Sequence, residues 1–279
     1  MSRYPALFTR LNSTGEGAFV PFVMLGDPTE DDSVAIIEAL IAGGADALEL
    51  GVPFSDPVAD GPTIQAAHIR ALDAHIDVDT ALRIVRRIRD AHPELPIGLL
   101  IYGNVPFARG LDSFYADVAA AGADSVLLPD IPVREGRDFI AAADAAGIDQ
   151  IFIAPPHASE ATLEGVAANS RGYIYAVSRV GVTGAEHASS TDGLKEVVDN
   201  LTRFGGAPVI LGFGISRPKH VAAAIDAGAA GAISGSAVTD IVAKHCVGTS
   251  PAPRTIDDRD ALLTELTEFV STMKAATRA

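Results

Sequence analysis

One short pattern recurs along this chain and constrains its fold more than any other feature: an alanine-rich helix ends at glycine, and a short apolar strand follows. Glycine just past a helix supplies the left-handed cap, and the apolar run has the length of one buried parallel strand. Strands that alternate with helices in this way indicate a parallel sheet. The copies begin at Ala42, Ala121, Ala146 and Ala227.

Eight strands are expected when the segments between these copies are included. Eight strand–helix units in a chain of 279 residues match a closed (β/α)8 TIM barrel, expected as one domain over residues 1–279. Extra helices are expected near 5–12, covering the barrel bottom, and near 258–276. An open doubly wound sheet usually has a Gly-x-Gly-x-x-Gly turn after its first strand, and residues 25–28 lack it. The expected strands are 18–25, 46–51, 96–102, 124–129, 149–154, 172–177, 207–212 and 230–235.

Composition excludes some classes of protein. The formal charge of −15 argues against nucleic-acid binding, although backbone N–H groups at helix starts could still hold a small anion. No apolar run approaches the ~18 residues that span a bilayer, and residues 1–5 lack the apolar core of a signal peptide. The single cysteine, Cys246, permits no internal disulfide and suits a reducing cytoplasm. No His and Cys cluster has metal-ligand spacing, so no metal is expected.

Glu49 is the first candidate for chemistry, because it lies at the C-terminal end of the second expected strand. Side chains alternate along a strand, so Leu48 and Leu50 would face the helices and Glu49 the barrel interior. Burial among apolar neighbours should raise its pKa, which makes it a plausible proton donor near neutral pH. The alternative is an internal ion pair, for which Arg179 is the nearest Arg candidate.

Asp60 closes the proline-rich loop that follows Glu49. It could be the N-cap of the next helix or a second catalytic acid, and the residues alone leave both interpretations open. For Asp56, which precedes a proline, a turn is favoured over chemistry. His68, His75 and His92 fall on helical patterns and are expected at the surface.

Three glycine-rich stretches, 181–184, 212–216 and 234–236, each follow an expected strand late in the chain. Barrel enzymes often bind phosphate with the loops after strands 7 and 8 and the start of a short helix. Ordinary turn glycines are the alternative. Several apolar residues in or just after strands could form either core or a pocket for a flat aromatic ligand. They are Phe22, Leu100, Tyr102, Leu127, Ile153, Tyr175 and Phe213.

Residues 48–65 resemble the signature of the tryptophan synthase alpha chain, and so do residues 178–184, 212–216 and 231–236. The opening segments 19–22 and 25–28 also match. The resemblance covers about residues 3–246 in order. It implies a (β/α)8 barrel that cleaves indole-3-glycerol phosphate to indole and glyceraldehyde 3-phosphate, a carbon–carbon lyase reaction of tryptophan biosynthesis.

The resemblance also implies roles for single residues. Glu49 would protonate the indole ring carbon and take part in deprotonating the glycerol hydroxyl, and Asp60 would contact the indole N–H and stabilise the developing positive charge. Residues 179–190 would close over the ligand as a lid. The implied indole pocket is Phe22, Leu100, Leu127, Tyr175, Thr183 and Phe213, and the implied phosphate site is Gly184, Gly214, Gly235 and Ser236.

The family implies no cofactor in this chain and a pyridoxal-phosphate beta chain as partner, which receives indole in a cytoplasmic α2β2 heterotetramer. Pro53, Asp56 and Asn104 lie in loops that the family turns toward that partner. Two departures are noted: residues 247–279 are longer and richer in proline than expected of the family, and Pro129 lies near the pocket.

Two other functions compete with this one. Another phosphate-sugar barrel enzyme is possible, but a synthase that forms indoleglycerol phosphate is expected to have a catalytic Lys at a strand end, and none is seen. A degenerate subunit that only activates its beta partner is the second alternative, and the presence of both Glu49 and Asp60 argues against it.

Overall fold

The computed structural model describes residues 2–177 and 193–278 of the protein. Each of the eight expected strand ranges contains an observed strand, usually shorter by a residue or two at its ends. The strands are β1 (Ala18–Met24), β2 (Leu48–Gly51), β3 (Ile97–Leu100), β4 (Ser125–Leu127), β5 (Asp149–Ile151), β6 (Ile153–Ala154), β7 (Ile174–Val177), β8 (Val209–Gly212), β9 (Gly231–Ser234), β10 (Cys246–Val247) and β11 (Thr255–Ile256).

Within the described residues, the first nine strands form one sheet in the order β5-β4-β3-β2-β1-β9-β8-β7-β6. Every pairing in this sheet is parallel. The two ends of this order, β5 and β6, are separated in the chain by Phe152 alone. They are therefore two halves of the single strand expected at 149–154. One half pairs with β4 and the other with β7, so the sheet closes on itself and the predicted TIM barrel is confirmed.

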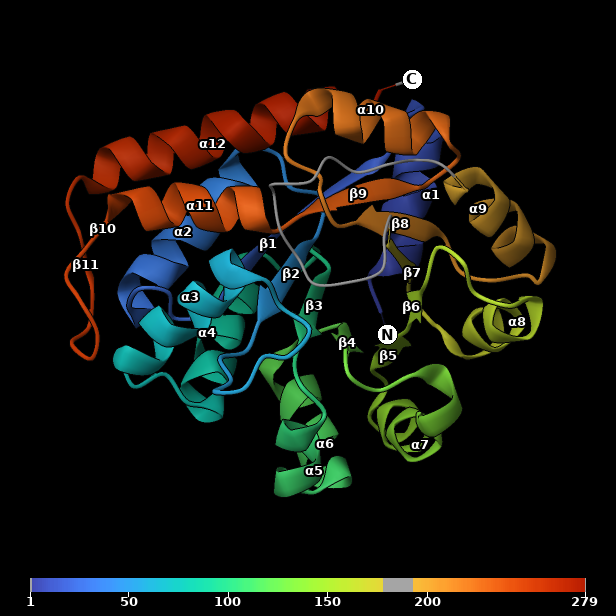
Figure 1. Ribbon diagram of the computed structural model, residues 1–279, viewed down its shortest axis with the longest axis horizontal. Coiled ribbons are helices and arrows are strands. Elements are labelled where there is room, and N and C mark those ends of the chain that lie inside the picture. Colours follow the sequence, from blue (N-terminus) through green and yellow to red (C-terminus); the bar gives the residue numbers. More distant parts are fainter. Residues whose placement is uncertain (1, 178–192, 279) are drawn as a thin grey trace.

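Helices surround this barrel on all sides, as Figure 1 shows. The expected helices near 5–12 and 258–276 are observed as α1 and α12. The helices are α1 (Tyr4–Thr14), α2 (Glu30–Ala42), α3 (Pro62–Asp73), α4 (Val78–Ala91), α5 (Asn104–Arg109), α6 (Leu111–Ala121), η1 (Val133–Glu135), α7 (Arg137–Ala146), α8 (Glu160–Asn169), α9 (Leu194–Arg203), α10 (Pro218–Asp226), α11 (Ser236–His245) and α12 (Arg259–Ala275). None of the described helices is long and apolar enough to cross a membrane.

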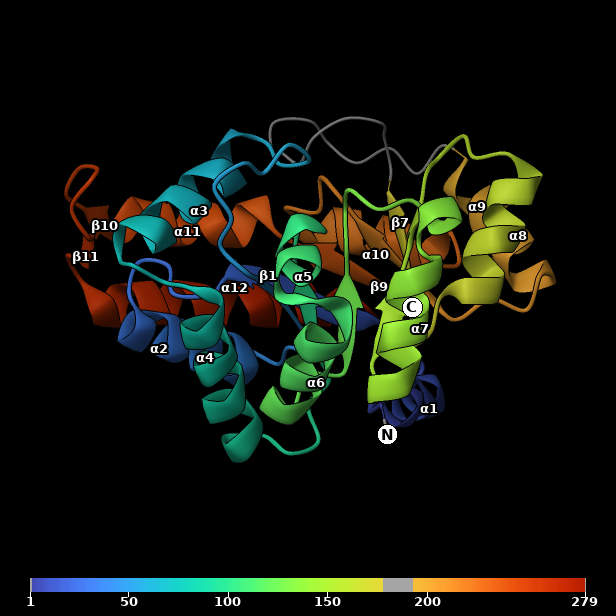
Figure 2. The same cartoon turned by 90° about the horizontal axis from the view of Figure 1, so that it is seen from below.

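Helix α1 closes the end of the barrel where the strands begin. The hydroxyls of Tyr4 in α1 and Ser125 at the start of β4 are 2.9 Å apart. Figure 2 shows α1 at the opposite end of the barrel from α3. Because α1 covers the strand N-terminal ends, the C-terminal ends are the ones left open for a site.

The repeated glycine unit also sets the register between neighbouring strands. In three copies an Asp follows the glycine by two positions, and in two of these its side chain accepts a hydrogen bond from the backbone of the adjacent strand. Asp46 accepts from the N–H of Phe19 (3.0 Å), and Asp124 accepts from the N–H of Ile97 (2.9 Å). Each Asp backbone N–H donates in return to the carbonyl of the same residue. The repeat thus supplies both a helix end and a strand-pairing contact.

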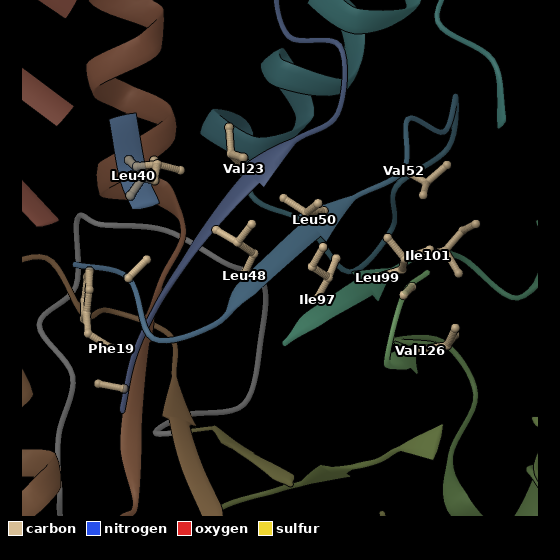
Figure 3. Packing of buried hydrophobic residues seen from close by; sticks show 14 of the residues in the cluster. Phe19, Val23, Leu40, Leu48, Leu50, Val52, Ile97, Leu99, Ile101 and Val126 are labelled. Atoms are coloured by element: carbon tan, nitrogen blue, oxygen red, sulfur yellow. The ribbon is translucent and has the colours of Figure 1, made fainter. Parts of the chain in front are cut away.

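The core has two layers, one between the strands and the helices and one inside the barrel. Leu48 and Leu50 belong to the outer layer with Leu40 of α2, as Figure 3 shows. The inner layer includes Phe22 and Tyr173. The predicted orientation of Leu48 and Leu50 toward the helices is therefore confirmed, and Glu49 between them points the other way.

Candidate active site

A cavity of about 230 Å³ opens at the C-terminal ends of the barrel strands. Its walls include the last residues of β3, β4 and β7, which are Leu100, Leu127 and Val177. A single water needs only ~10–15 Å³, so this cavity can accept an organic ligand. Of the expected indole pocket, the structure brings together Phe22, Leu100, Leu127, Tyr175 and Phe213 on its walls. Thr183, the sixth, lies outside the described residues.

Glu49 lies on the wall of this cavity with only 2% of its surface exposed. Strand register places it between Phe22 of β1 and Gly98 of β3. The Tyr173 hydroxyl donates a hydrogen bond to Glu49 Oε1 at 3.0 Å. Burial raises the pKa of Glu49 to about 8; the Tyr173 hydrogen bond opposes this shift and the negative charge of Asp60 adds to it. Glu49 therefore holds a proton at neutral pH.

The internal ion pair considered as an alternative for Glu49 stays a prediction. Arg179 lies outside the described residues, and the contact seen is the Tyr173 hydroxyl. The sequence did not single out Tyr173, although strand alternation places it on the same face as Tyr175, two residues later. Its ring also makes an edge contact with Tyr4 of α1, with centroids 5.3 Å apart.

Asp60 lines the same cavity and is 5% exposed. Gly61 occupies the N-cap of α3, so the interpretation of Asp60 as a helix cap is wrong. The Asp60 carboxylate instead accepts through Oδ2 from the Tyr102 hydroxyl at 2.7 Å, and His68 Nε2 lies 3.2 Å from the same oxygen. Tyr102, a candidate for the pocket wall, thus contacts an acid instead.

The expectation that His68 lies at the surface is wrong, since it is 2% exposed. The spacing of four residues from Ile64 is the signal that could have shown this, because it places His68 on the buried stripe of α3. A polar residue on a helical pattern is usually solvated, but here the apolar residue one turn earlier marks the inward face. His75 is exposed and His92 half-buried.

Three of the four expected phosphate-site residues, Gly214, Gly235 and Ser236, line the cavity, and Gly184 lies outside the described residues. Helix α11 begins at Ser236, and the first N–H groups of a helix have no intrahelical acceptor. Gly212 plays a different part, because a Cβ there would lie 2.2 Å from the Tyr175 ring. Because Gly212 has no side chain, the Tyr175 ring can lie against it and form part of the cavity wall.

Of the residues expected to face a partner, Pro53 and Asp56 lie in the loop between β2 and α3, and Asn104 is the first residue of the short helix α5. Pro53 is buried in the isolated chain, whereas Asp56 and Asn104 are exposed. Asp56 lies in a turn, as expected, with its carbonyl accepting from the N–H of Val58 at 2.9 Å. Pro129 lines the cavity. Within the described part of the chain, no three His, Cys, Asp or Glu side chains group as metal ligands.

A closed barrel in which a buried carboxyl group of raised pKa and a second acid line one largely apolar cavity is typical of one class of protein: a TIM-barrel enzyme that works by proton transfer. Sequence similarity identifies the particular family. The family model for the tryptophan synthase alpha chain matches residues 8–278. The tryptophan synthase alpha chain of Corynebacterium efficiens is 67% identical over 278 residues, which cover 100% of this chain and 99% of that protein.

Solved structures agree with this assignment. Tryptophan synthase from Mycobacterium tuberculosis superposes with a TM-score of 0.85 at 29% identity, covering 100% of this chain and 99% of that one. The alpha subunit from Legionella pneumophila gives 0.85 at 28% identity, covering 99% and 98%. The chain belongs to the tryptophan synthase alpha chain family. It is a carbon–carbon lyase that cleaves indole-3-glycerol phosphate in tryptophan biosynthesis.

The same matches correct one expectation about the C-terminal segment. Residues 247–279 were expected to be longer than in the family, but the family model extends to residue 278 and the Corynebacterium relative aligns over the whole chain. Helix α12 packs against α2, α10 and α11, so the segment is part of the barrel's outer layer.

Proposed function

We propose that Glu49 is the acid that protonates the indole ring carbon bearing the glycerol chain. A buried carboxyl group with a pKa of about 8 carries the proton that this step needs at neutral pH. As the carbon–carbon bond breaks, the adjacent glycerol hydroxyl becomes the aldehyde and releases a proton, which Glu49 takes up. The acid gives one proton and receives one, so it ends the cycle as it began.

Asp60 is proposed as the second acid of the reaction, contacting the indole N–H. Protonation of the ring carbon leaves positive charge on the ring nitrogen, and a carboxylate beside it stabilises that charge. Asp60 suits this role because it lines the same cavity as Glu49 and its Oδ2 is held by two side chains. The apolar walls, including Phe22, Leu127 and Phe213, fit the flat ring.

The substrate phosphate is proposed to bind where Gly214, Gly235 and Ser236 meet, at the start of α11. Among the described residues that line the cavity, none is Lys, Arg or His. Backbone N–H groups, the Ser236 hydroxyl and the dipole of α11 can then bind the anion. Gly184 and Thr183 remain predicted members of the phosphate site and the indole pocket, and residues 179–190 a predicted lid.

A pyridoxal-phosphate beta chain is the proposed partner and recipient of indole, in an α2β2 assembly. The two segments expected to face it, the loop after β2 and the short helix α5, each carry a large apolar side chain that is exposed in this chain: Val58 at 75% and Phe107 at 76%. Two single side chains are not a patch, but burial of both by a partner would remove apolar surface from water. The cytoplasmic location of this assembly and the absence of a cofactor in this chain remain predictions.

The observation that carries the proposal is that two buried acids, Glu49 with its raised pKa and Asp60, line one largely apolar cavity. Its test is indole release from indole-3-glycerol phosphate by the purified chain, alone and with a beta chain. Glu49→Gln keeps the shape and removes the transferable proton, so kcat should fall by at least about 100-fold while substrate affinity changes little. Glu164→Gln, at an exposed position on α8, is the control.

Equal kinetics for Glu49→Gln and the parent would overturn the acid assignment. No indole from the parent under either condition would instead favour the alternative of a subunit that only activates its partner.

A further inference from the structure

His68 contacts both ends of the loop that carries Asp60. Its Nδ1 accepts a hydrogen bond from the backbone N–H of Phe54 at 3.0 Å, and its Nε2 lies 3.2 Å from Asp60 Oδ2. An accepting Nδ1 carries no proton, so the neutral ring holds its proton on Nε2 and donates it to Asp60. Both ring nitrogens are used, and only this neutral tautomer satisfies both contacts.

Tyr102, like His68, contacts both the backbone of this loop and the Asp60 carboxylate. Its hydroxyl donates to Asp60 Oδ2 at 2.7 Å and accepts from the backbone N–H of Ala59 at 3.0 Å. Its ring stacks on Phe54, with centroids 5.2 Å apart. Two buried side chains from outside the loop therefore hold its backbone and its carboxylate together.

We propose that His68 is a positioning residue which, together with Tyr102, fixes the plane of the Asp60 carboxylate and so directs Oδ1 at the ring nitrogen of the substrate. Both contacts are made to Oδ2. Because a carboxylate is planar, two donors that hold Oδ2 in place also set the direction in which Oδ1 points. This inference rests on the role proposed above for Asp60.

Held in this way, the Asp60 carboxylate need not reorient as positive charge develops on the ring nitrogen of the substrate. Preorganised groups act mainly in the transition state, and a displacement of about 1 Å in such a group can cost ~100-fold in rate. Loss of the His68 contact should therefore lower kcat more than it raises KM.

Two substitutions separate the two contacts of His68. His68→Asn places an acceptor near Nδ1, so it keeps the Phe54 contact and loses the donor to Asp60. His68→Gln places an N–H group near Nε2, so it keeps the Asp60 contact and loses the Phe54 one. His75→Asn, at an exposed position, is the matched control. For indole-3-glycerol phosphate cleavage, kcat should fall about 10- to 100-fold in His68→Asn and less than about 5-fold in His68→Gln and His75→Asn.

Binding gives a readout that does not depend on activity. The probes are indole-3-propyl phosphate and its benzothiophene counterpart, which has the same shape but no ring N–H. The parent should bind the indole compound more tightly, and this preference should shrink toward one in His68→Asn and persist in His68→Gln. Tyr102→Phe, which keeps the ring stack and removes the hydroxyl, should also lose the preference and serves if His68→Asn does not fold.

The outcomes are distinguishable. A parent without preference for the N–H compound would contradict the proposed role of Asp60 itself. A parent with that preference, and variants that keep it, would overturn the positioning role of His68. Equal weakening of both compounds in His68→Asn would mean that His68 only supports the fold.

Discussion

Glu49 suits the proposed role of proton donor at neutral pH because its surroundings disfavour the charged form. Its Tyr173 contact favours ionisation, yet burial outweighs it and the pKa reaches about 8. A carboxyl group in this position lowers the stability of the fold whenever it must ionise. The proposed proton donor is thus a residue that the fold tolerates at a cost in stability.

This cost predicts a pH-dependent difference in stability. Glu49 binds its proton more tightly in the folded chain, with a pKa of about 8, than at its ordinary value of 4.5. Its contribution to the free energy of unfolding therefore falls as pH rises from about 4.5 to about 8. Glutamine cannot ionise, so the free energy of unfolding of Glu49→Gln does not contain this loss. The difference between Glu49→Gln and the parent should therefore shift in favour of Glu49→Gln when the pH is raised from 6 to 9. Urea denaturation of both proteins at these pH values measures this, and a constant difference would contradict it.

At the scale of elements, the ends of strands and the starts of helices determine the site. Gly212 at the end of β8 leaves room for the Tyr175 ring, and α11 starts at the cavity with Gly235 before it. At Gly235 the φ angle is −104° and an added Cβ would meet Phe22 at 3.6 Å, an ordinary contact. A side chain can therefore be added there without displacing the backbone.

That space allows a direct test of the phosphate site. Gly235→Asp places a negative charge beside the proposed anion, and two such charges near a protein surface repel by about 1–4 kcal/mol at 4 Å. The affinity for indole-3-propyl phosphate should fall at least about 5-fold, while the melting temperature should not fall, because an acid at a helix start is favourable. Calorimetry measures the affinity, and Gly235→Ala is the control. Unchanged affinity in Gly235→Asp would place the phosphate elsewhere.

At the scale of the whole molecule, the barrel was predictable from sequence because its signals are local. The repeated glycine, the apolar runs and the position of Glu49 between Leu48 and Leu50 each depend on neighbouring residues. The break at Phe152 and the contact of Tyr102 with Asp60 depend on residues that only the closed barrel brings together, whereas the burial of His68 had a local signal in its spacing from Ile64. Alternation with Tyr175 indicates which face Tyr173 is on, but its contact with Glu49 joins residues far apart in the chain and could not be found from sequence.

The central claim is that the folded barrel keeps Glu49 protonated at neutral pH. Carbon-13 NMR of the chain labelled at glutamate side-chain carboxyls, compared with Glu49→Gln to assign the signal, follows this ionisation directly. The midpoint for Glu49 should lie near pH 8, well above its ordinary value of 4.5. A midpoint at that ordinary value would mean that Glu49 is ionised at neutral pH, and it would contradict its assignment as the proton donor.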